Sequence, residues 1–289
     1  MDALQRIEKA LEAAVSKGLG DGCPPLLAQA VRHAVFTPGS RVRPRLTLAV
    51  AAACGDDVPS VTDAAAASIE LLHCASLVHD DLPCFDDADV RRGAPSVHRA
   101  FGERLAVLAG DGLIVLAFEN IAWNTLRHPE RLAPLTMIVG RAVGMCDGIV
   151  AGQAWESEPQ VELTAYHRQK TAALFAAATE AGAAAAGHDP SDWRTLGANL
   201  GEAYQVADDI RDVASSVEEL GKPVGQDAAH DRPSAVAKLG LDGALERLQE
   251  LTRGAIDSIP DCRGADKLKL LVRAEMTRLL PAGLADGID

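Results

Sequence analysis

The chain has 289 residues, 48% of them hydrophobic and only 3% aromatic, and its formal net charge is −13 at pH 7. This charge argues against nucleic acid as a partner, because phosphate backbones are bound through clustered Lys and Arg. A core of Ala, Leu, Val and Ile favours packed helices over sheets, and no linker marks a boundary, so we expect one domain over residues 1–289.

Apolar residues recur at steps of three and four along almost the whole chain, as in Leu4, Ile7, Leu11 and Val15 of the first predicted helix. No alternating pattern with hairpin turns and no βαβ rhythm is present. The prediction is an all-α helical bundle with inward-facing functional side chains. Further helices are predicted, with boundaries good to about 2–4 residues, over 25–36, 44–54, 59–82, 103–124, 130–151, 163–187, 191–219, 233–240, 242–257 and 263–280.

The start of the chain is charged throughout and lacks the apolar stretch of a signal peptide. Glu70, His73 and Glu180 interrupt the longest apolar runs, so that none reaches the roughly 18 residues needed to cross a bilayer. The six cysteines show no metal-finger spacing. We therefore expect a cytoplasmic enzyme with reduced cysteines and no membrane span.

The densest polar segment, HDDLPCFDDADVRRG, follows an apolar helix and occupies residues 79–93. Asp80 and Asp81 lie near the end of that helix. Pro83 disfavours helical geometry at the residue before it, so the chain can turn and bring Asp86 back toward Asp80. The segment therefore predicts a carboxylate-lined turn at the end of a core helix.

A second acidic cluster lies within a long predicted helix, where Asp208 and Asp212 share one face at four-residue spacing. Two such clusters facing each other need cations between them, because like charges about 4 Å apart repel by roughly 4 kcal/mol at an effective dielectric near 20. Oxygen-only ligands select Mg²⁺, Mn²⁺ or Ca²⁺ over zinc. Arg91 and Arg92 can donate to phosphate oxygens, so a metal-bound diphosphate is the expected ligand. The alternative for either cluster is a solvated acidic helix end.

On these residues the chain resembles the trans-isoprenyl diphosphate synthases, and most closely the bacterial geranylgeranyl diphosphate synthases of carotenoid pathways. The motifs that carry the resemblance are DDxxxxD followed by RRG, and DDxxD, which are formed by Asp80, Asp81 and Asp86 and by Asp208, Asp209 and Asp212. The resemblance implies an isoprenoid-synthase bundle with a central active-site cavity, a homodimer, and about three Mg²⁺ ions per site, for which Mn²⁺ can substitute. The metal ligands that it implies are Asp80, Asp86, Asp208, Asp209 and Asp212, with Asp81 ligating or orienting bound water.

The same resemblance assigns the residues that hold the two substrates. The allylic diphosphate would contact Arg91, Lys170, Thr171, Gln205, Lys222 and Arg232, and isopentenyl diphosphate would contact Arg43, His73 and Arg92. One departure stands in the segment PGSRVRP, where relatives read GGKRLRP, so that Ser40 replaces a lysine of the isopentenyl site. Affinity for isopentenyl diphosphate should be lower, and Arg41 is the neighbouring cation that can compensate.

The implied reaction is a head-to-tail (1′–4) condensation of isopentenyl diphosphate with an allylic diphosphate. Asp80, Asp81, Asp86, Lys170 and Asp208 would carry the catalysis, by assisting loss of the allylic diphosphate to leave a carbocation. The double bond of isopentenyl diphosphate attacks the cation, and the released diphosphate takes the proton.

Product length should depend on the helix that precedes Asp80, where Leu72, Ala75 and Ser76 lie four to eight residues earlier. Farnesyl-producing relatives carry an aromatic side chain at the place of Ala75. Because this chain has a methyl group there, we expect geranylgeranyl diphosphate (C20), with Leu72 or a neighbouring helix closing the pocket.

Three other functions remain open at this stage, besides a helical protein without catalysis. A farnesyl diphosphate synthase would make a C15 product. A class I terpene cyclase would usually lack the RRG and the DDxxD motif. A noncatalytic synthase-like subunit would usually have lost one aspartate motif. Both motifs are intact here.

Overall fold

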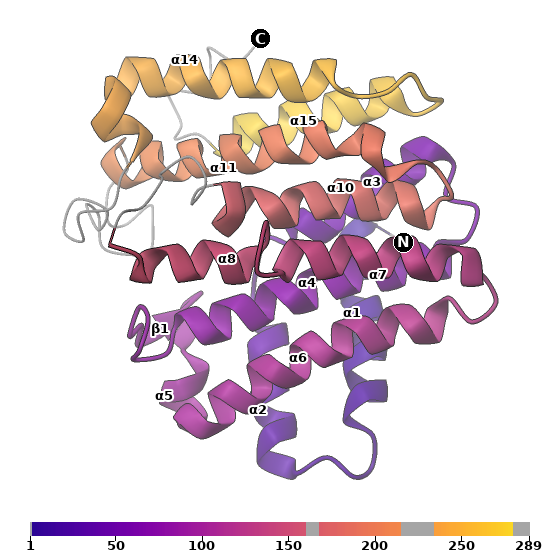
Figure 1. Cartoon of the computed structure of the whole chain (residues 1–289), viewed down its shortest axis with the longest axis vertical. Coiled ribbons are helices and arrows are strands. Elements are labelled where there is room, and N and C mark those ends of the chain that lie inside the picture. The colour runs from indigo at the N-terminus through magenta and orange to yellow at the C-terminus, as the bar shows by residue number, and fades with distance from the viewer. Residues whose placement is uncertain (1, 160–167, 215–233, 280–289) are drawn as a thin grey trace. The chain divides into compact units, whose positions relative to one another are not determined.

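The computed structural model describes residues 2–159, 168–214 and 234–279. The chain forms two compact units, which are taken one at a time below. Unit 1 comprises Met1–Gly140 and Glu180–Pro190, and unit 2 comprises Arg141–Thr179 and Ser191–Asp289. Nearly all regular structure is helical, so the predicted all-α class is confirmed (Figure 1).

Unit 1 is built around two long apolar helices, α4 and α6, which pack against each other (Figure 1). Buried polar groups fix how the two helices meet: Ser68 donates to the carbonyl of Ala117 at 2.8 Å, and the Asn120 amide donates to the carbonyl of Ala64 at 3.0 Å. The helices of this unit are α1 (Ala3–Leu19), α2 (Pro25–Phe36), α3 (Val42–Cys54), α4 (Pro59–Asp80), α5 (Val97–Phe101), α6 (Glu103–Asn124) and most of α7 (Pro129–Val143).

A short antiparallel hairpin interrupts the helices of unit 1 after α4. Its strands are β1 (Val90–Arg91) and β2 (Ala94–Pro95), with Arg91 opposite Ala94. The loop residues Arg92 and Gly93 have φ angles of 53° and 77°. Two consecutive residues with positive φ form the turn that matches the twist of paired strands. The sequence patterns did not predict this hairpin, because strands of two residues are too short to show alternation.

Unit 2 contains α8 (Ile149–Ala154), η1 (Trp155–Ser157), η2 (Arg168–Ala172), η3 (Pro190–Trp193, which begins in unit 1), α11 (Arg194–Ala214), α14 (Ala235–Asp257) and α15 (Ala265–Leu279), while α10 (Ala173–Ala185) belongs to both units. Within it, α11 packs against η2, α14 and α15. A Cβ at Gly201 would lie 2.5 Å from the Cα of Ala172, so glycine lets α11 approach η2 closely. The turn η2 is a π-helix, a form often found at functional sites.

Among the described residues, α4 and α6 are each long and apolar enough to cross a membrane, judged by length and composition alone. Glu70 and His73 do not shorten α4 below that length, contrary to the sequence expectation. In the structure, 78% of the apolar window of α4 is buried but only 44% of that of α6. The burial of α4 is what the core helix of a folded unit shows, whereas several apolar residues of α6 remain exposed.

Candidate active site

The first aspartate motif forms a closed turn at the end of α4. The helix ends at Asp80, and the N–H of Asp86 donates to the carbonyl oxygen of Asp80 at 2.9 Å. The predicted return of Asp86 toward Asp80 is therefore confirmed. The side chain of Asp86 is exposed and that of Asp80 half-buried. Asp80 and Asp86 are therefore both accessible to a ligand.

The middle carboxylate of the motif has a different environment. Asp81 is buried, and its Oδ1 accepts two hydrogen bonds from Arg91, at 2.9 Å from Nε and 2.5 Å from Nη2. Burial raises the pKa of Asp81, and the guanidinium of Arg91 opposes that shift without cancelling it. Asp81 and Arg91 thus anchor the hairpin to α4, and in this conformation the carboxylate of Asp81 is directed at an arginine.

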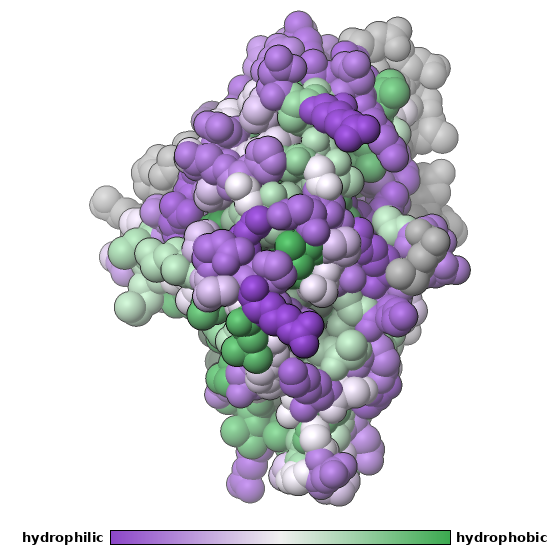
Figure 2. All heavy atoms as spheres, turned by 90° about the vertical axis from the view of Figure 1, so that its right-hand side faces the viewer, coloured by the Kyte–Doolittle hydropathy of each residue, from purple (hydrophilic) through white to green (hydrophobic). Residues whose placement is uncertain are grey.

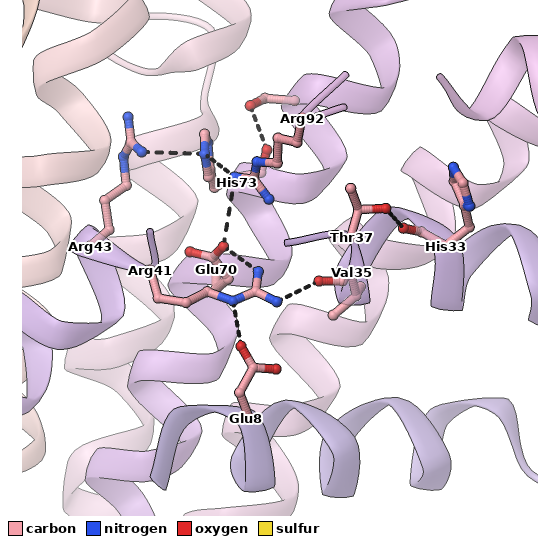
Figure 3. A network of polar contacts seen from close by, with 10 residues as sticks. Glu8, His33, Val35, Thr37, Arg41, Arg43, Glu70, His73 and Arg92 are labelled. Atoms are coloured by element: carbon pink, nitrogen blue, oxygen red, sulfur yellow. Dashed lines mark hydrogen bonds and ion pairs between the residues drawn. The ribbon is translucent and has the colours of Figure 1, made fainter. Parts of the chain in front are cut away.

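Cations gather around the imidazole of His73, two helical turns before Asp80 (Figure 3). Arg43 Nη1 lies 3.3 Å and Arg92 Nη2 3.1 Å from Nε2 of His73. Burial lowers the pKa of His73 well below its usual value, and Arg43 and Arg92 lower it further. The imidazole is therefore neutral, with Nε2 as the acceptor, and the three predicted residues of the isopentenyl site lie together in unit 1.

Beneath this cluster lies a buried ion pair that the sequence patterns did not reveal. Arg41 Nη1 donates to Glu70 Oε1 at 2.7 Å, and both side chains are at most 2% exposed. The other nitrogens of Arg41 donate to Glu8 at 2.8 Å and to the carbonyl of Val35 at 2.7 Å (Figure 3). Arg41 is thus fully engaged inside unit 1, and the expectation that it compensates for the lysine missing at Ser40 is wrong.

A glycine in the chain segment before α3 leaves the space that Arg92 occupies. A Cβ at Gly39 would lie 2.8 Å from Cζ and Nη1 of Arg92, so a larger residue would require this guanidinium to shift. Ser40, which follows it, is exposed. In the sequence, Gly39 only stands next to Ser40, which replaces the lysine of relatives. That Gly39 leaves space for Arg92 is visible only in the structure.

The second aspartate motif lies on α11 in unit 2. Asp208 is half-buried and pairs with Arg211 at 2.8 Å. Asp209 is buried: its Oδ1 accepts from Gln205 at 3.0 Å and its Oδ2 accepts from the N–H of Ala235 at 2.7 Å. Gln205 in turn accepts from the hydroxyl of Thr171 at 3.1 Å. Thr171, Gln205 and Asp209, all predicted from the motifs, thus form one hydrogen-bonded chain.

Several predicted site residues lie outside the described part of the structure. Lys222 and Arg232 are among them, and for Lys170 and Asp212 only the helical backbone is described. The predicted chain-length residues all lie on α4: Leu72 and Ala75 are buried, and Ser76 is half-buried and donates to the carbonyl of His73 at 2.9 Å. The opposition of the two aspartate motifs stays a prediction, because they lie in different units.

The first motif offers carboxylate oxygens to a divalent cation. Among the residues that the structure describes, no group of three or more His, Cys, Asp or Glu side chains could hold a metal. Mg²⁺ is usually held by one or two carboxylates together with substrate phosphates and water, so a ready three-ligand cage is not required. Asp80 and Asp86 supply two accessible oxygen ligands on one turn, and this donor set fits Mg²⁺ or Mn²⁺.

Comparisons with known proteins find relatives that match along most of the chain. A family model described as polyprenyl synthetase matches residues 24–263. The geranylgeranyl diphosphate synthase of Cereibacter sphaeroides is 53% identical over 97% of this chain and 98% of its own length. The farnesyl diphosphate synthase of Geobacillus stearothermophilus is 38% identical over 84% of each chain.

Solved structures show the same likeness along most of the chain. The geranylgeranyl pyrophosphate synthetase from Pyrococcus horikoshii aligns with a TM-score of 0.80 at 28% identity, covering 93% of this chain and 94% of that one. A geranyltransferase from Legionella pneumophila also gives 0.80, at 29% identity over 96% and 94% of the two chains. Fold, motifs and identity agree, and the chain belongs to the polyprenyl synthetase family.

Proposed function

We propose that this protein is a prenyltransferase that joins isopentenyl diphosphate head to tail (1′–4) to an allylic diphosphate, with geranylgeranyl diphosphate (C20) as its product. The observation that carries the proposal is the juxtaposition on α4 of accessible Asp80 with the cation cluster around His73. Two accessible carboxylates and a set of guanidinium donors are what a metal-bound diphosphate and a free diphosphate require.

The residues of unit 1 would bind and orient isopentenyl diphosphate. Arg43 and Arg92 share the acceptor Nε2 of His73, which directs both guanidinium groups to one place and keeps the imidazole neutral. A diphosphate that arrives there replaces a neutral acceptor with a charged one, and charge-assisted hydrogen bonds are roughly twice as strong as neutral ones.

The allylic diphosphate is assigned to Asp80, Asp86 and Asp208 through Mg²⁺, with Mn²⁺ as a substitute. When bound, the metal neutralises charge that develops on the departing diphosphate. Arg91, Lys170, Thr171, Gln205, Lys222 and Arg232 are proposed to contribute hydrogen bonds to the same group. Asp81 holds Arg91 in place, and Asp209 holds Gln205. Apolar residues around α4 would exclude water from the allylic carbocation that forms when the diphosphate departs.

We also propose that two copies associate. The exposed face of α6 carries the apolar residues Val107, Leu108 and Val115, which are 42–57% exposed. Apolar side chains exposed in this way are also visible among the polar ones on the face shown in Figure 2. A second copy covering α6 would bury this area without a membrane, which fits the proposed cytoplasmic location. A role in carotenoid formation is a further proposal, supported by the likeness to bacterial geranylgeranyl diphosphate synthases.

Incubation of the protein with Mg²⁺, isopentenyl diphosphate and each allylic diphosphate in turn tests the proposal. Chromatography should show geranylgeranyl diphosphate as the main product and no activity in excess EDTA. Farnesyl diphosphate as the end product would indicate the farnesyl synthase that the Geobacillus relative exemplifies. Cyclic hydrocarbons would indicate a terpene cyclase, and absence of turnover would indicate a noncatalytic subunit.

A further inference from the structure

We propose that Glu70 is a positioning residue of the isopentenyl diphosphate site: its buried carboxylate lies between Arg41 and Arg92 and holds the Arg92 guanidinium against His73. The identity of the ligand rests on the proposed function, whereas the geometry does not. Figure 3 shows the connection from Glu8 through Arg41 and Glu70 to Arg92 and His73.

The pair of Arg41 and Glu70 within this connection is closed to solvent. Glu70 is 1% exposed, and its Oε1 accepts from Arg41 at 2.7 Å. Arg41 itself is held by α1 through Glu8 and by the end of α2 through the carbonyl of Val35. Three elements therefore fix the guanidinium of Arg41, and Arg41 fixes one oxygen of Glu70 in space.

The upper half reaches the partly accessible cations. Arg92 Nη2 lies 4.0 Å from Glu70 Oε1, the same oxygen that Arg41 uses, and 3.1 Å from Nε2 of His73. The side chain of Arg92 is 20% exposed, so one side of the guanidinium faces Glu70 while part of it stays available. Its backbone is held in the hairpin turn, and Gly39 leaves the space that it occupies.

The charge balance explains why a carboxylate is needed at this place. Arg43, Arg92, Arg41 and Arg91 all lower the pKa of His73, which means that four cations act on one neutral acceptor. Glu70 is the anion that contacts two of them. Without it, mutual repulsion would spread the guanidinium groups while no diphosphate is bound, and binding would first have to bring them together again.

The test compares Michaelis constants of the full-length protein. Glu70→Gln should raise the KM for isopentenyl diphosphate by at least about tenfold, the loss expected for one charge-assisted interaction. The KM for the allylic diphosphate should stay nearly unchanged. Because this variant removes the buried anion paired with Arg41 and leaves Arg41 with the partly exposed Glu8, it should also lower Tm.

The double variant Arg41→Gln/Glu70→Gln separates the effect of Glu70 on the position of Arg92 from its effect on the stability of the fold. Two neutral amides can hydrogen-bond to each other, so Tm should recover most of the loss. If Glu70 positions Arg92 through its charge, the KM for isopentenyl diphosphate remains raised. Recovery of both Tm and KM would overturn the proposal, because Glu70 would then serve the fold alone.

A matched control uses another ion-pair network of unit 1. Arg6 pairs with Asp63 near the start of α4 and, at 3.1 Å, with Asp56, which precedes α4. Arg6→Gln should lower Tm while leaving the KM for isopentenyl diphosphate unchanged. An equal rise in KM in this control would show that loss of stability alone explains the effect, and would overturn the proposal.

A readout without substrate keeps this inference separate from the proposed function. ¹⁵N NMR of the imidazole nitrogens, assigned with His73→Asn, should show Nε2 of His73 as a hydrogen-bonded acceptor in the wild type. The Nε2 signal should shift toward that of an unbonded acceptor in the double variant. An unchanged signal would overturn the positioning role even if the enzyme is active, whereas a shifted signal in a protein without turnover would refute only the proposed function.

Discussion

The N–H of Asp86 donates to the carbonyl oxygen of Asp80, 2.9 Å away, so that a backbone hydrogen bond joins the two accessible carboxylate residues of the first motif. The distance between these residues is thus set by the main chain rather than by their side chains. Neutral substitutions at either position should therefore change metal affinity without opening the turn.

Asp86→Asn tests this point. The amide keeps the size of the side chain but is a weak ligand for Mg²⁺, so half-maximal activity should require about tenfold more Mg²⁺ and kcat should fall by about 10²–10³. Titration of initial rates with MgCl₂ measures both quantities. Asp87→Asn is the matched control: it removes the same charge one residue later, at a positive φ of 45° that asparagine tolerates, and should leave the Mg²⁺ requirement unchanged.

Ser40→Lys should lower the KM for isopentenyl diphosphate. Ser40 is exposed in the segment before α3, and a lysine there adds a charged donor near Arg43 without burying its charge. We expect a decrease of about three- to tenfold, equivalent to one partly exposed charge-assisted hydrogen bond. Ser40→Met provides a chain of similar length without charge. An equal gain in that variant would contradict an electrostatic cause.

Ala75→Tyr should shorten the product from C20 to C15. Ala75 is 1% exposed on α4, so the phenol ring must displace neighbouring side chains or fill whatever space the growing chain uses. Product chromatography distinguishes C15 from C20, and circular dichroism checks that the variant is folded. Ala75→Ser changes polarity at almost constant volume and should keep C20. A folded tyrosine variant that still makes C20 would reject this residue as the determinant.

Stability should decrease below about pH 6.5 because of His73. Burial and the neighbouring arginines hold its pKa well below the usual value, so the unfolded chain binds a proton that the folded protein does not. The free energy of unfolding should therefore fall as pH drops, by up to about 1.4 kcal/mol per pH unit for this one group. Urea unfolding between about pH 7.5 and 5.5 measures the slope, in a range where most carboxylates stay ionised.

Two histidine variants provide the comparison. His73→Asn should reduce the slope, because asparagine takes no proton. His188→Asn, at an exposed position, should leave it as in the wild type. A slope that is the same in all three proteins would contradict the neutral, acceptor state of His73.

Val115→Asp should weaken association of two copies. Val115 is 57% exposed on α6, and a charge there would have to be desolvated in an interface that covers this helix. Sedimentation velocity over a concentration series should shift from dimer toward monomer. Leu270 is 69% exposed on α15 of unit 2, and Leu270→Asp should leave the assembly unchanged. A wild-type monomer at all concentrations would refute the dimer.

Hydrophobic periodicity and helix signals predicted many of the helices closely. Ranges 25–36 and 103–124 coincide with α2 and α6, since Pro25 begins one and Gly102 precedes the other. The predicted helix 130–151 was wrong in its middle: α7 ends at Val143 and α8 begins at Ile149. Gly148 folds against Gly144 there, where a Cβ would meet the backbone at 2.3 Å.

Single residues also set the local backbone elsewhere. The break predicted between the helices over 233–240 and 242–257 is confirmed within α14, because Gly240 has non-helical backbone angles, with φ at 73°. A glycine between two apolar patterns has the same appearance in sequence whether it ends a helix or bends it. The π-helical turn η2 likewise has no sequence signal, because its side-chain pattern differs little from that of an α-helix over five residues.

The motif residues of the candidate site were predictable because their chemistry is local in sequence. The pair of Arg41 and Glu70 was not, since 29 residues separate partners that only the packing of α3 and α4 brings together. In the sequence, Glu70 is a single acidic residue inside an apolar run, and this pattern indicates an interrupted membrane span but no partner. Arg41 is identified as its partner only from the folded structure.

The missing methyl group at Gly39 has a practical consequence for anyone who redesigns this loop. Positions 39 and 40 are adjacent but differ: Ser40 is exposed and leaves space for a longer side chain, whereas a Cβ at Gly39 would require the Arg92 guanidinium to shift. In libraries that vary both sites together, favourable changes at position 40 would often be combined with changes at position 39 that displace Arg92. Randomising the serine while keeping its neighbour constant is the more productive route.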